Sequence, residues 1–233
     1  MTESMSSRKT RLRRHELEVY LPDTRGVSIS RWGKGNLKLG SNVFTYSKLP
    51  GRPEDGGTCP GAGECLDYCY SLRIRSSTPL VWQVYRNNTD NGPSLPLLPD
   101  EAALVRLHVT GDFDTVPYII AWITLIADHP QVQFWGYTRS WRVPELLEAL
   151  EKLRTLPNIQ LLASIDRTSQ DLPPATWRRA YVAALGFTPE RINTVVRGRM
   201  AYVCPEELGR KPDCEHCGYC IRGKHGDVVF LQH

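Results

Sequence analysis

The stretch V-R-L-H-V-T-G-D-F-D-T-V-P-Y-I-I-A-W-I-T-L-I-A-D-H-P-Q-V-Q-F-W-G-Y-T, residues 105–138, decides the fold class of this chain. Val105 to Thr110 is a short apolar run typical of a buried strand. The turn Gly111 to Asp114 follows, and then an apolar helix from Val116 to Asp128, which a proline ends. Val132 to Thr138 is the next strand. Strands that begin about thirty residues apart, with a helix between them, predict a parallel sheet.

The same alternation extends to both sides of this stretch. Further strands are predicted at Asn42 to Ser47, Ile159 to Ile165, Ile192 to Val196 and Asp227 to Leu231. Further helices are predicted after Cys69 with a break near Pro79, from Pro144, and from Pro173-Pro174 to Gly186. The count is therefore six strands in one α/β domain.

Composition bounds the remaining possibilities. The chain has 233 residues, 41% of them hydrophobic, and a net charge of +4, which permits a nucleic-acid partner without requiring one. Residues 1–41 are predicted to be a basic tail and lead-in. For the tail, a solvated, disordered end is favoured over an arm that binds nucleic acid. Residues 42–233 are predicted to be the domain, including a cysteine-rich metal loop at 204–220. No secretory signal or membrane span is expected, so a cytoplasmic location is predicted.

Three of the seven cysteines lie close together in T-C-P-G-A-G-E-C-L-D-Y-C-Y, Thr58 to Tyr70. Proline and glycine in the first gap prevent helix and strand, so the backbone can curl and aim the thiols of Cys59, Cys65 and Cys69 at one point. Thiolates select zinc or iron–sulfur clusters, and a closed tetrahedral site needs four ligands. Three cysteines therefore predict either a distant fourth ligand or an open metal position.

The other four cysteines form the pattern C-x9-C-x2-C-x2-C at Cys204, Cys214, Cys217 and Cys220. Four thiolates complete a closed site, which is either structural zinc or a [4Fe–4S] cluster. The repeated C-x2-C spacing with Gly218 favours the cluster slightly over zinc. Clustered cysteines in a chain without a secretory signal argue for metal rather than disulfides.

Polar residues follow the predicted strands, at the sheet edge where α/β proteins bind ligands. They are His108, Asp112 and Asp114; Tyr137, Thr138 and Arg139; Ser164, Asp166 and Arg167; Arg197 and Arg199; and His233. Each one alone is also a common helix cap or turn former, and Asp114 in particular is expected to suit the cap of the Val116 helix. Five strand ends in a row, with the cysteine loop at the sixth, predict a binding site.

The motifs together resemble the gene product 88 family of phages, plasmids and actinobacterial genomes. The resemblance rests on T-C-P-G-A…C…C-Y at Thr58–Tyr70, H-x-x-G-D-F at His108–Phe113, Y-T-R-S at Tyr137–Ser140 and S-x-D at Ser164–Asp166. It finishes with the C-P…C-x2-C-x2-C pattern and a final strand ending in His, Cys204–His233.

A wider resemblance is to radical S-adenosylmethionine (SAM) enzymes, in which three cysteines after the first strand hold a [4Fe–4S] cluster that binds SAM. It implies a partial six-stranded parallel β/α barrel with a C-terminal cysteine-rich metal loop similar to auxiliary clusters. The spacing here, five and then three residues between cysteines, differs from the usual three and then two. By this resemblance Gly111, Asp112, Ser164 and Asp166 would bind the cofactor, and Asp112, Arg139, Asp166 and His233 would line the mouth of the site.

Three functions follow as hypotheses. The first is an iron–sulfur enzyme with radical-SAM-like chemistry, which needs an electron donor. The second is a nucleic-acid-binding protein whose metal sites are structural. The third is a metal-dependent hydrolase or nuclease that holds a divalent cation on Asp112, Asp114 and Asp166. The sequence leaves the substrate and the oligomeric state open.

Overall fold

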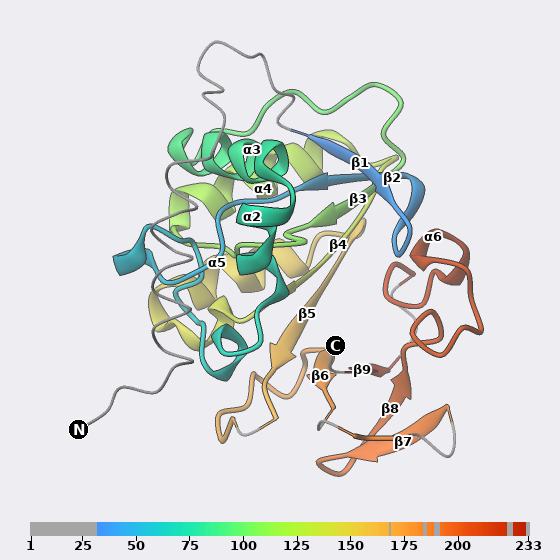
Figure 1. The fold of residues 1–233 in the computed structure, drawn as a ribbon. Coiled ribbons are helices and arrows are strands. Elements are labelled where there is room, and N and C mark those ends of the chain that lie inside the picture. The colour runs from blue at the N-terminus through green and yellow to red at the C-terminus, as the bar shows by residue number, and fades with distance from the viewer. Residues whose placement is uncertain (1–31, 168, 184–185, 189–191, 223–225, 232–233) are drawn as a thin grey trace.

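The computed structural model describes residues 32–167, 169–183, 186–188, 192–222 and 226–231. The described residues form a nine-stranded sheet in the order β1-β2-β3-β4-β5-β6-β9-β8-β7 (Figure 1). The strands are β1 (Gly33–Asn36), β2 (Gly40–Tyr46), β3 (Leu104–Leu107), β4 (Gln133–Thr138), β5 (Ile159–Ile165), β6 (Arg179–Val182), β7 (Asn193–Val196), β8 (Arg199–Val203) and β9 (Asp227–Phe230).

The sheet is largely parallel. The strands from β2 to β6, followed by β9 and β8, pair in parallel, whereas β1 and β7 add an antiparallel strand at each edge. The expectation of a mixed α/β fold with a parallel sheet is therefore confirmed. The six expected strands correspond to β2, β3, β4, β5, β7 and β9.

Helices cover one face of the sheet (Figure 1). They are α2 (Ile74–Ser77), α3 (Pro79–Asp90), α4 (Val116–Asp128) and α5 (Pro144–Arg154), with short 3-10 segments η1 (Pro53–Asp55), η2 (Glu64–Leu66), η3 (Tyr70–Arg73) and η4 (Ser140–Arg142). A row of aligned strand residues, Phe44, Val105, Phe134 and Ile159, lies with residues of α4 and α5 in the main hydrophobic core. The break between α2 and α3 falls at Thr78, directly before the proline that predicted it.

The C-terminal cysteine-rich segment, with α6 (Cys214–Cys217), covers the opposite face (Figure 1). Val43 and Trp135 pack there against Ile221. Leu162 and Val228 belong to a neighbouring small cluster, with Cys204 and Cys220 packed into it. The sheet therefore lies between a helical layer and a cysteine-rich layer.

Three differences from the expected topology concern the C-terminal half and the N-terminal edge. The helix expected from Pro173-Pro174 to Gly186 is wrong, because residues 179–182 form β6, which pairs with β5 and β9. The strand expected at Ile192 is present as β7, but it is an antiparallel hairpin partner of β8. The lead-in before Asn42 contributes β1, so the domain includes residues from Trp32 onward. Long-range strand pairing decides each case and overrides local propensity.

The helix ends follow local chemistry. Thr115, rather than Asp114, is the N-cap of α4, and its hydroxyl accepts the backbone N–H of Tyr118 at 3.4 Å. On the surface of α5, Glu148 and Lys152 form the expected i,i+4 ion pair at 2.7 Å. Within the described residues, none of the helices combines the length and apolarity that crossing a bilayer requires.

Candidate metal centre

The first cysteine loop, Thr58–Tyr70, lies against the carboxyl ends of β3 and β4. The hydroxyl of Thr58 donates to a main-chain carbonyl at 2.9 Å and accepts the backbone N–H of Asp112 at 3.3 Å. A Cβ atom at Gly61 would lie 2.1 Å from the carbonyl oxygen of Arg139, so only glycine permits this approach. The loop is thus placed at the ligand-binding edge of the sheet, as the order of the motifs predicted.

The thiols of Cys59, Cys65 and Cys69 are free and partly exposed. Burial raises the pKa of Cys59 to about 12, and the charge of Asp112 acts in the same direction. Burial also raises the pKa of Cys65, while the charge of Arg139 opposes this effect. Thiolate charge on Cys65 or Cys69 would raise the pKa of Cys59 further, so the three sulfurs share one electrostatic environment. They offer three potential metal ligands, one fewer than a closed site needs.

Asp112 is buried and holds the turn after β3 against the end of β4. One carboxylate oxygen accepts the hydroxyl of Thr138 at 2.6 Å and the backbone N–H of Phe113 at 2.8 Å, and the other accepts the backbone N–H of Arg139 at 2.7 Å. Burial raises the pKa of Asp112, and these hydrogen bonds oppose the rise. Gly111, with φ of 77°, supplies the left-handed turn before it. The expected contact of Asp112 with an ammonium group stays a prediction.

Arg139 and Asp166 form an ion pair beside the cysteine loop. The guanidinium donates from Nε and Nη2 to one oxygen of Asp166, at 2.9 and 2.5 Å, and the hydroxyl of Tyr68 donates to the same oxygen at 3.2 Å. Burial lowers the pKa of Arg139, but the charges of Cys65 and Asp166 outweigh burial and leave it raised. A permanently charged cation therefore lies next to the first group of thiols.

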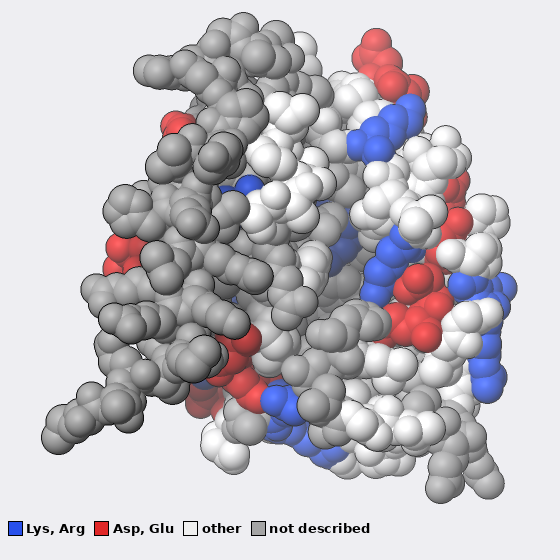
Figure 2. All heavy atoms as spheres, viewed as in Figure 1, with Lys and Arg blue, Asp and Glu red and all other residues white. Residues whose placement is uncertain are grey.

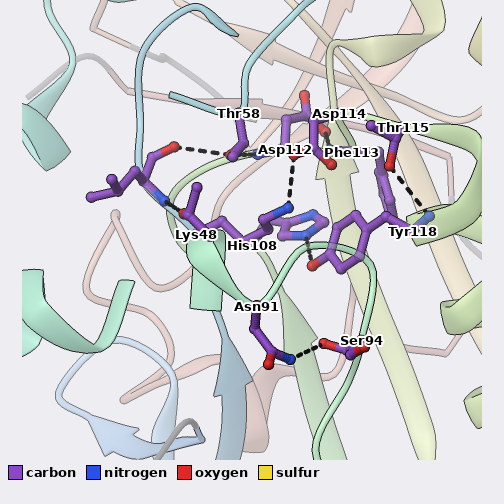
Figure 3. A network of polar contacts seen from close by, with 12 residues as sticks. Lys48, Thr58, Asn91, Ser94, His108, Asp112, Phe113, Asp114, Thr115 and Tyr118 are labelled. Atoms are coloured by element: carbon purple, nitrogen blue, oxygen red, sulfur yellow. Dashed lines mark hydrogen bonds and ion pairs between the residues drawn. The ribbon is translucent and has the colours of Figure 1, made fainter. Parts of the chain in front are cut away.

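A buried polar cluster lies next to the turn that carries Asp112 (Figure 3). The Nζ atom of Lys48 is 2.7 Å from Asp114 and 4.2 Å from the centre of the Tyr118 ring, and Nε2 of His108 is 2.8 Å from the Tyr118 hydroxyl. Burial, followed by the charges of Lys48 and Arg106, lowers the pKa of His108 well below its usual value. His108 is a neutral residue of the core, packed against aromatic rings, so it does not belong to the exposed rim expected at the strand ends.

The second cysteine group, Cys204, Cys214, Cys217 and Cys220, lies on the opposite face of the sheet. The backbone N–H of Cys214 donates to the carbonyl of Lys38 at 2.9 Å, and the next residue donates to the carbonyl of Leu39 at 3.0 Å. These bonds join the end of the chain to the beginning of β2. Charge on Cys204 or Cys220 would raise the pKa of Cys214, whereas Cys59 is affected by Cys65 and Cys69, so the cysteines lie in two groups. Their role as metal ligands stays a prediction.

Arg106 supplies positive charge to this second group. Its guanidinium lies 4.2 Å from the centre of the Tyr137 ring, and the Tyr137 hydroxyl donates to the sulfur of Cys220. Burial raises the pKa of Cys214 to about 12 and also raises that of Cys220, while the charge of Arg106 opposes both shifts. Arg106 is buried, and within the described ranges no carboxylate forms an ion pair with it. A buried guanidinium fits an anionic metal–thiolate group.

Potential ligand atoms lie close together at one place in the described structure. Among the described residues, the one group of three ligating side chains with all donor atoms within 4.8 Å of one another is Cys204, Glu206 and Glu207. The two carboxylates of this group are paired with a lysine: the Nζ atom of Lys38 lies 2.5 Å from an oxygen of Glu207 and 3.6 Å from an oxygen of Glu206. In neither cysteine group do three sulfur atoms meet this limit. Four sulfurs bound to one zinc would lie only about 3.8 Å apart, given Zn–S bonds of about 2.3 Å.

The remaining predicted residues are placed as follows. Ser164 ends β5, and its carbonyl accepts the indole N–H of Trp141 at 3.1 Å. Asp112, Asp114 and Asp166 each bind a different partner and do not form a group of carboxylates within 4.8 Å of one another. His233 and the basic tail at residues 1–14 lie outside the described residues.

Charge on the visible surface is mixed. On the face shown in Figure 2, the described Lys and Arg side chains are interspersed with Asp and Glu and do not merge into one basic patch. The nucleic-acid hypothesis thus gains no support from this face, and it stays a prediction.

Sequence reasoning missed two residues of this region, Lys48 and Arg106. Each is a cation at a position that the fold buries: Lys48 follows β2 and is 1% exposed, and Arg106 lies within the apolar run of β3 and is 9% exposed. A cation inside an apolar strand is the one signal that could have identified Arg106, because buried charges need partners.

Comparison with known proteins gives two results. A family model described as Gene product 88 matches residues 97–223, a segment that contains Asp112, Arg139, Asp166 and the second cysteine group. The Gene 88 protein of Mycobacterium phage D29 is 25% identical over 242 residues, covering 89% of this chain and 93% of the relative. The Gene 88 protein of Mycobacterium phage L5 is 24% identical over 241 residues with the same coverage.

The comparisons do not point to radical-SAM enzymes, and no solved structure matches the chain. The function therefore has to be argued from the site itself.

Proposed function

The chain belongs to the gene product 88 family, and from the site that it carries we propose that it is an iron–sulfur protein with radical-SAM-like chemistry. Cys59, Cys65 and Cys69 would hold a [4Fe–4S] cluster with one iron position open. The four cysteines of the second group would hold a further cluster, with structural zinc as the alternative there. The substrate is not identified by this proposal.

The number and grouping of the cysteines carry the proposal. All seven are free thiols, three of them on one loop and four in the C-terminal segment. Three thiols leave the fourth iron of a [4Fe–4S] cluster without a protein ligand, and four thiols complete a second cluster or a zinc site.

The charges beside both groups support the same assignment. Arg139 lies next to Cys65, and Arg106 lies next to Cys214 and Cys220. Thiolate-bound clusters are anionic, and nearby positive charge offsets the burial that raises the pKa of these thiols. Arg139 provides such charge at the first group, and Arg106, Arg178 and Lys38 provide it at the second.

The side chains of the first site would act mainly by position. Asp166 and Tyr68 fix the orientation of the Arg139 guanidinium against the cysteine loop, and Asp112 fixes the backbone on which Arg139 is carried. The bound cluster would supply one-electron chemistry at its open iron, with SAM as the ligand that the resemblance implies. Partial burial of the loop limits access of water to the thiols.

Purification without oxygen tests the proposal. Protein produced with iron and sulfide should be brown and carry about eight iron atoms per chain if both groups are loaded. Substituting Cys59, Cys65 and Cys69 together by alanine should remove about half of the iron and leave the spectrum of the second group. Colourless protein that contains only zinc would disprove the proposal.

Titration with SAM tests the finer part of it. Binding at the open iron should perturb the electron paramagnetic resonance spectrum of the reduced cluster, and Asp112→Ala should weaken the effect. A spectrum that SAM does not change, in protein shown to carry the first cluster, would leave an iron–sulfur protein without radical-SAM-like chemistry.

A further inference from the structure

A pocket of about 240 Å³ opens at the carboxyl ends of β5, β6 and β9. Its apolar walls include Val182, Val196 and Val229, and its charged lining residues are Asp166, Arg167 and Arg197. Asp166 is the residue that pairs with Arg139 beside the first cysteine group, so the pocket adjoins that site. The carboxyl edge of parallel strands is the usual place for a ligand in this class of fold.

The charges around the pocket leave one cation without a counterion. Asp166 is paired with Arg139 at 2.5 Å, and Arg167 is paired with Glu64 at 2.7 Å. Arg197 donates from one nitrogen to two main-chain carbonyls, at 3.3 and 2.6 Å, and no carboxylate in the described part of the chain pairs with it. The pocket lining, with its ion-pair partners, therefore carries one excess positive charge.

The backbone at Arg197 is held in an unfavourable conformation. Arg197 and Gly198 are the two residues that connect β7 to β8, with φ of 50° and 75°. Positive φ at both positions is typical of a type I′ turn, which favours Asn followed by Gly. An arginine at the first position is disfavoured there, and strained residues of this kind concentrate at functional sites. The turn chemistry alone does not explain why arginine occupies this position.

The geometry points to a binding site for a small organic carboxylate. Its carboxylate would pair with the guanidinium of Arg197, whose planar N–H groups suit two carboxylate oxygens. The apolar part of the ligand would contact Val182, Val196 and Val229. One excess charge matches a carboxylate rather than a phosphate monoester, which carries nearly two negative charges.

None of the residues that line the pocket is a cysteine, so the carboxylate site can be tested separately from the proposed function. The probes are 4-fluorobenzoate, its neutral amide 4-fluorobenzamide, and inorganic phosphate, each added to the full chain. Fluorine nuclear magnetic resonance reports binding of the first two, and phosphate is scored by its displacement of 4-fluorobenzoate. We expect 4-fluorobenzoate to bind at least about tenfold more tightly than the amide, as a charge-assisted bond would give.

Arg197→Asn separates the role of the side chain from the stability of the turn. Asparagine is favoured at this turn position, so the variant should unfold at the same temperature as the wild type or above it, while its affinity for 4-fluorobenzoate falls at least about tenfold. Arg86→Gln is the control, because Arg86 is an exposed residue of α3, a helix that does not line the pocket, and its substitution also removes one positive charge. It should leave binding unchanged.

Each contrary result would overturn the assignment. The carboxylate site is disproved if 4-fluorobenzoate does not bind the wild type, or if it binds Arg197→Asn equally well. If Arg86→Gln weakens the binding of 4-fluorobenzoate as much as Arg197→Asn does, the net charge of the protein explains the effect, and the site is also disproved. Displacement by phosphate at lower concentrations than the benzoate needs would show that the pocket prefers a different class of anion.

Discussion

Arg139 and Asp166 are joined by two hydrogen bonds to a single carboxylate oxygen, at 2.9 and 2.5 Å, where the ends of β4 and β5 meet. The Asp166 side chain is 3% exposed and that of Arg139 is 19% exposed. This pair connects the first cysteine loop, through Tyr68 and Cys65, to the pocket at β6 and β9. Loss of this ion pair should therefore lower both the free energy of unfolding and the metal content.

Removing the cation of this pair should be strongly destabilising. Arg139→Met leaves the buried carboxylate of Asp166 without its counterion, so the free energy of unfolding should fall by about 3 kcal/mol in urea titrations. The double variant Arg139→Met with Asp166→Leu should lose less free energy of unfolding than the sum of the losses in the two single variants. Additive losses would show that the two side chains act independently.

An exposed pair provides the comparison. Lys152→Gln disrupts the surface pair with Glu148, and screening by solvent should make its effect on unfolding small.

The close approach of Gly61 to Arg139 should be needed for loading of the first metal group. In Gly61→Ala the new methyl group would lie 2.1 Å from a main-chain oxygen, so the loop must move. We expect iron content to fall by about half, with the spectrum of the second group retained. Gly92→Asn is the control, since nothing lies within 4 Å of its Cβ position and asparagine tolerates its φ of 62°. Normal loading of Gly61→Ala would contradict the placement of the loop.

The two cysteine groups should differ in their effect on folding. Cys217→Ala or Cys220→Ala should lower stability, because the four-cysteine segment joins β8 and β9 to the residues before β2 and the metal proposed there would contribute folding energy. Cys59→Ala or Cys69→Ala should remove activity with less loss of stability. Thermal unfolding of the metal-loaded proteins measures the difference. Equal losses from both groups would mean that the first site is structural as well.

His108 should make the protein sensitive to acid. Its pKa in the folded state is depressed, so unfolding allows it to bind a proton, and stability should fall as the pH drops below about 6.5. The contribution is at most about 1.4 kcal/mol per pH unit. His108→Asn, which suits the φ of 52°, should show a weaker decline between pH 7 and pH 5 in urea titrations. An unchanged slope would mean that other groups govern the acid sensitivity.

The sequence by itself determined the fold class, most of the strands and the division of the cysteines. Hydrophobic runs and proline positions are local signals, so β2 to β5, the break before Pro79 and the start of α5 at Pro144 could be predicted. The spacing of the cysteines likewise separates three from four without knowledge of the fold.

Only the tertiary structure decided the strand order, the identity of β6 and the position of the second cysteine group. Residues 179–182 join the sheet because β5 and β9 offer hydrogen bonds on both sides, and such long-range pairing leaves no periodic signal within the segment. The burial of His108, Lys48 and Arg106 depends on neighbours that are far away in the chain. Local sequence gives a side chain its chemistry, but packing against distant segments decides whether water or protein surrounds it.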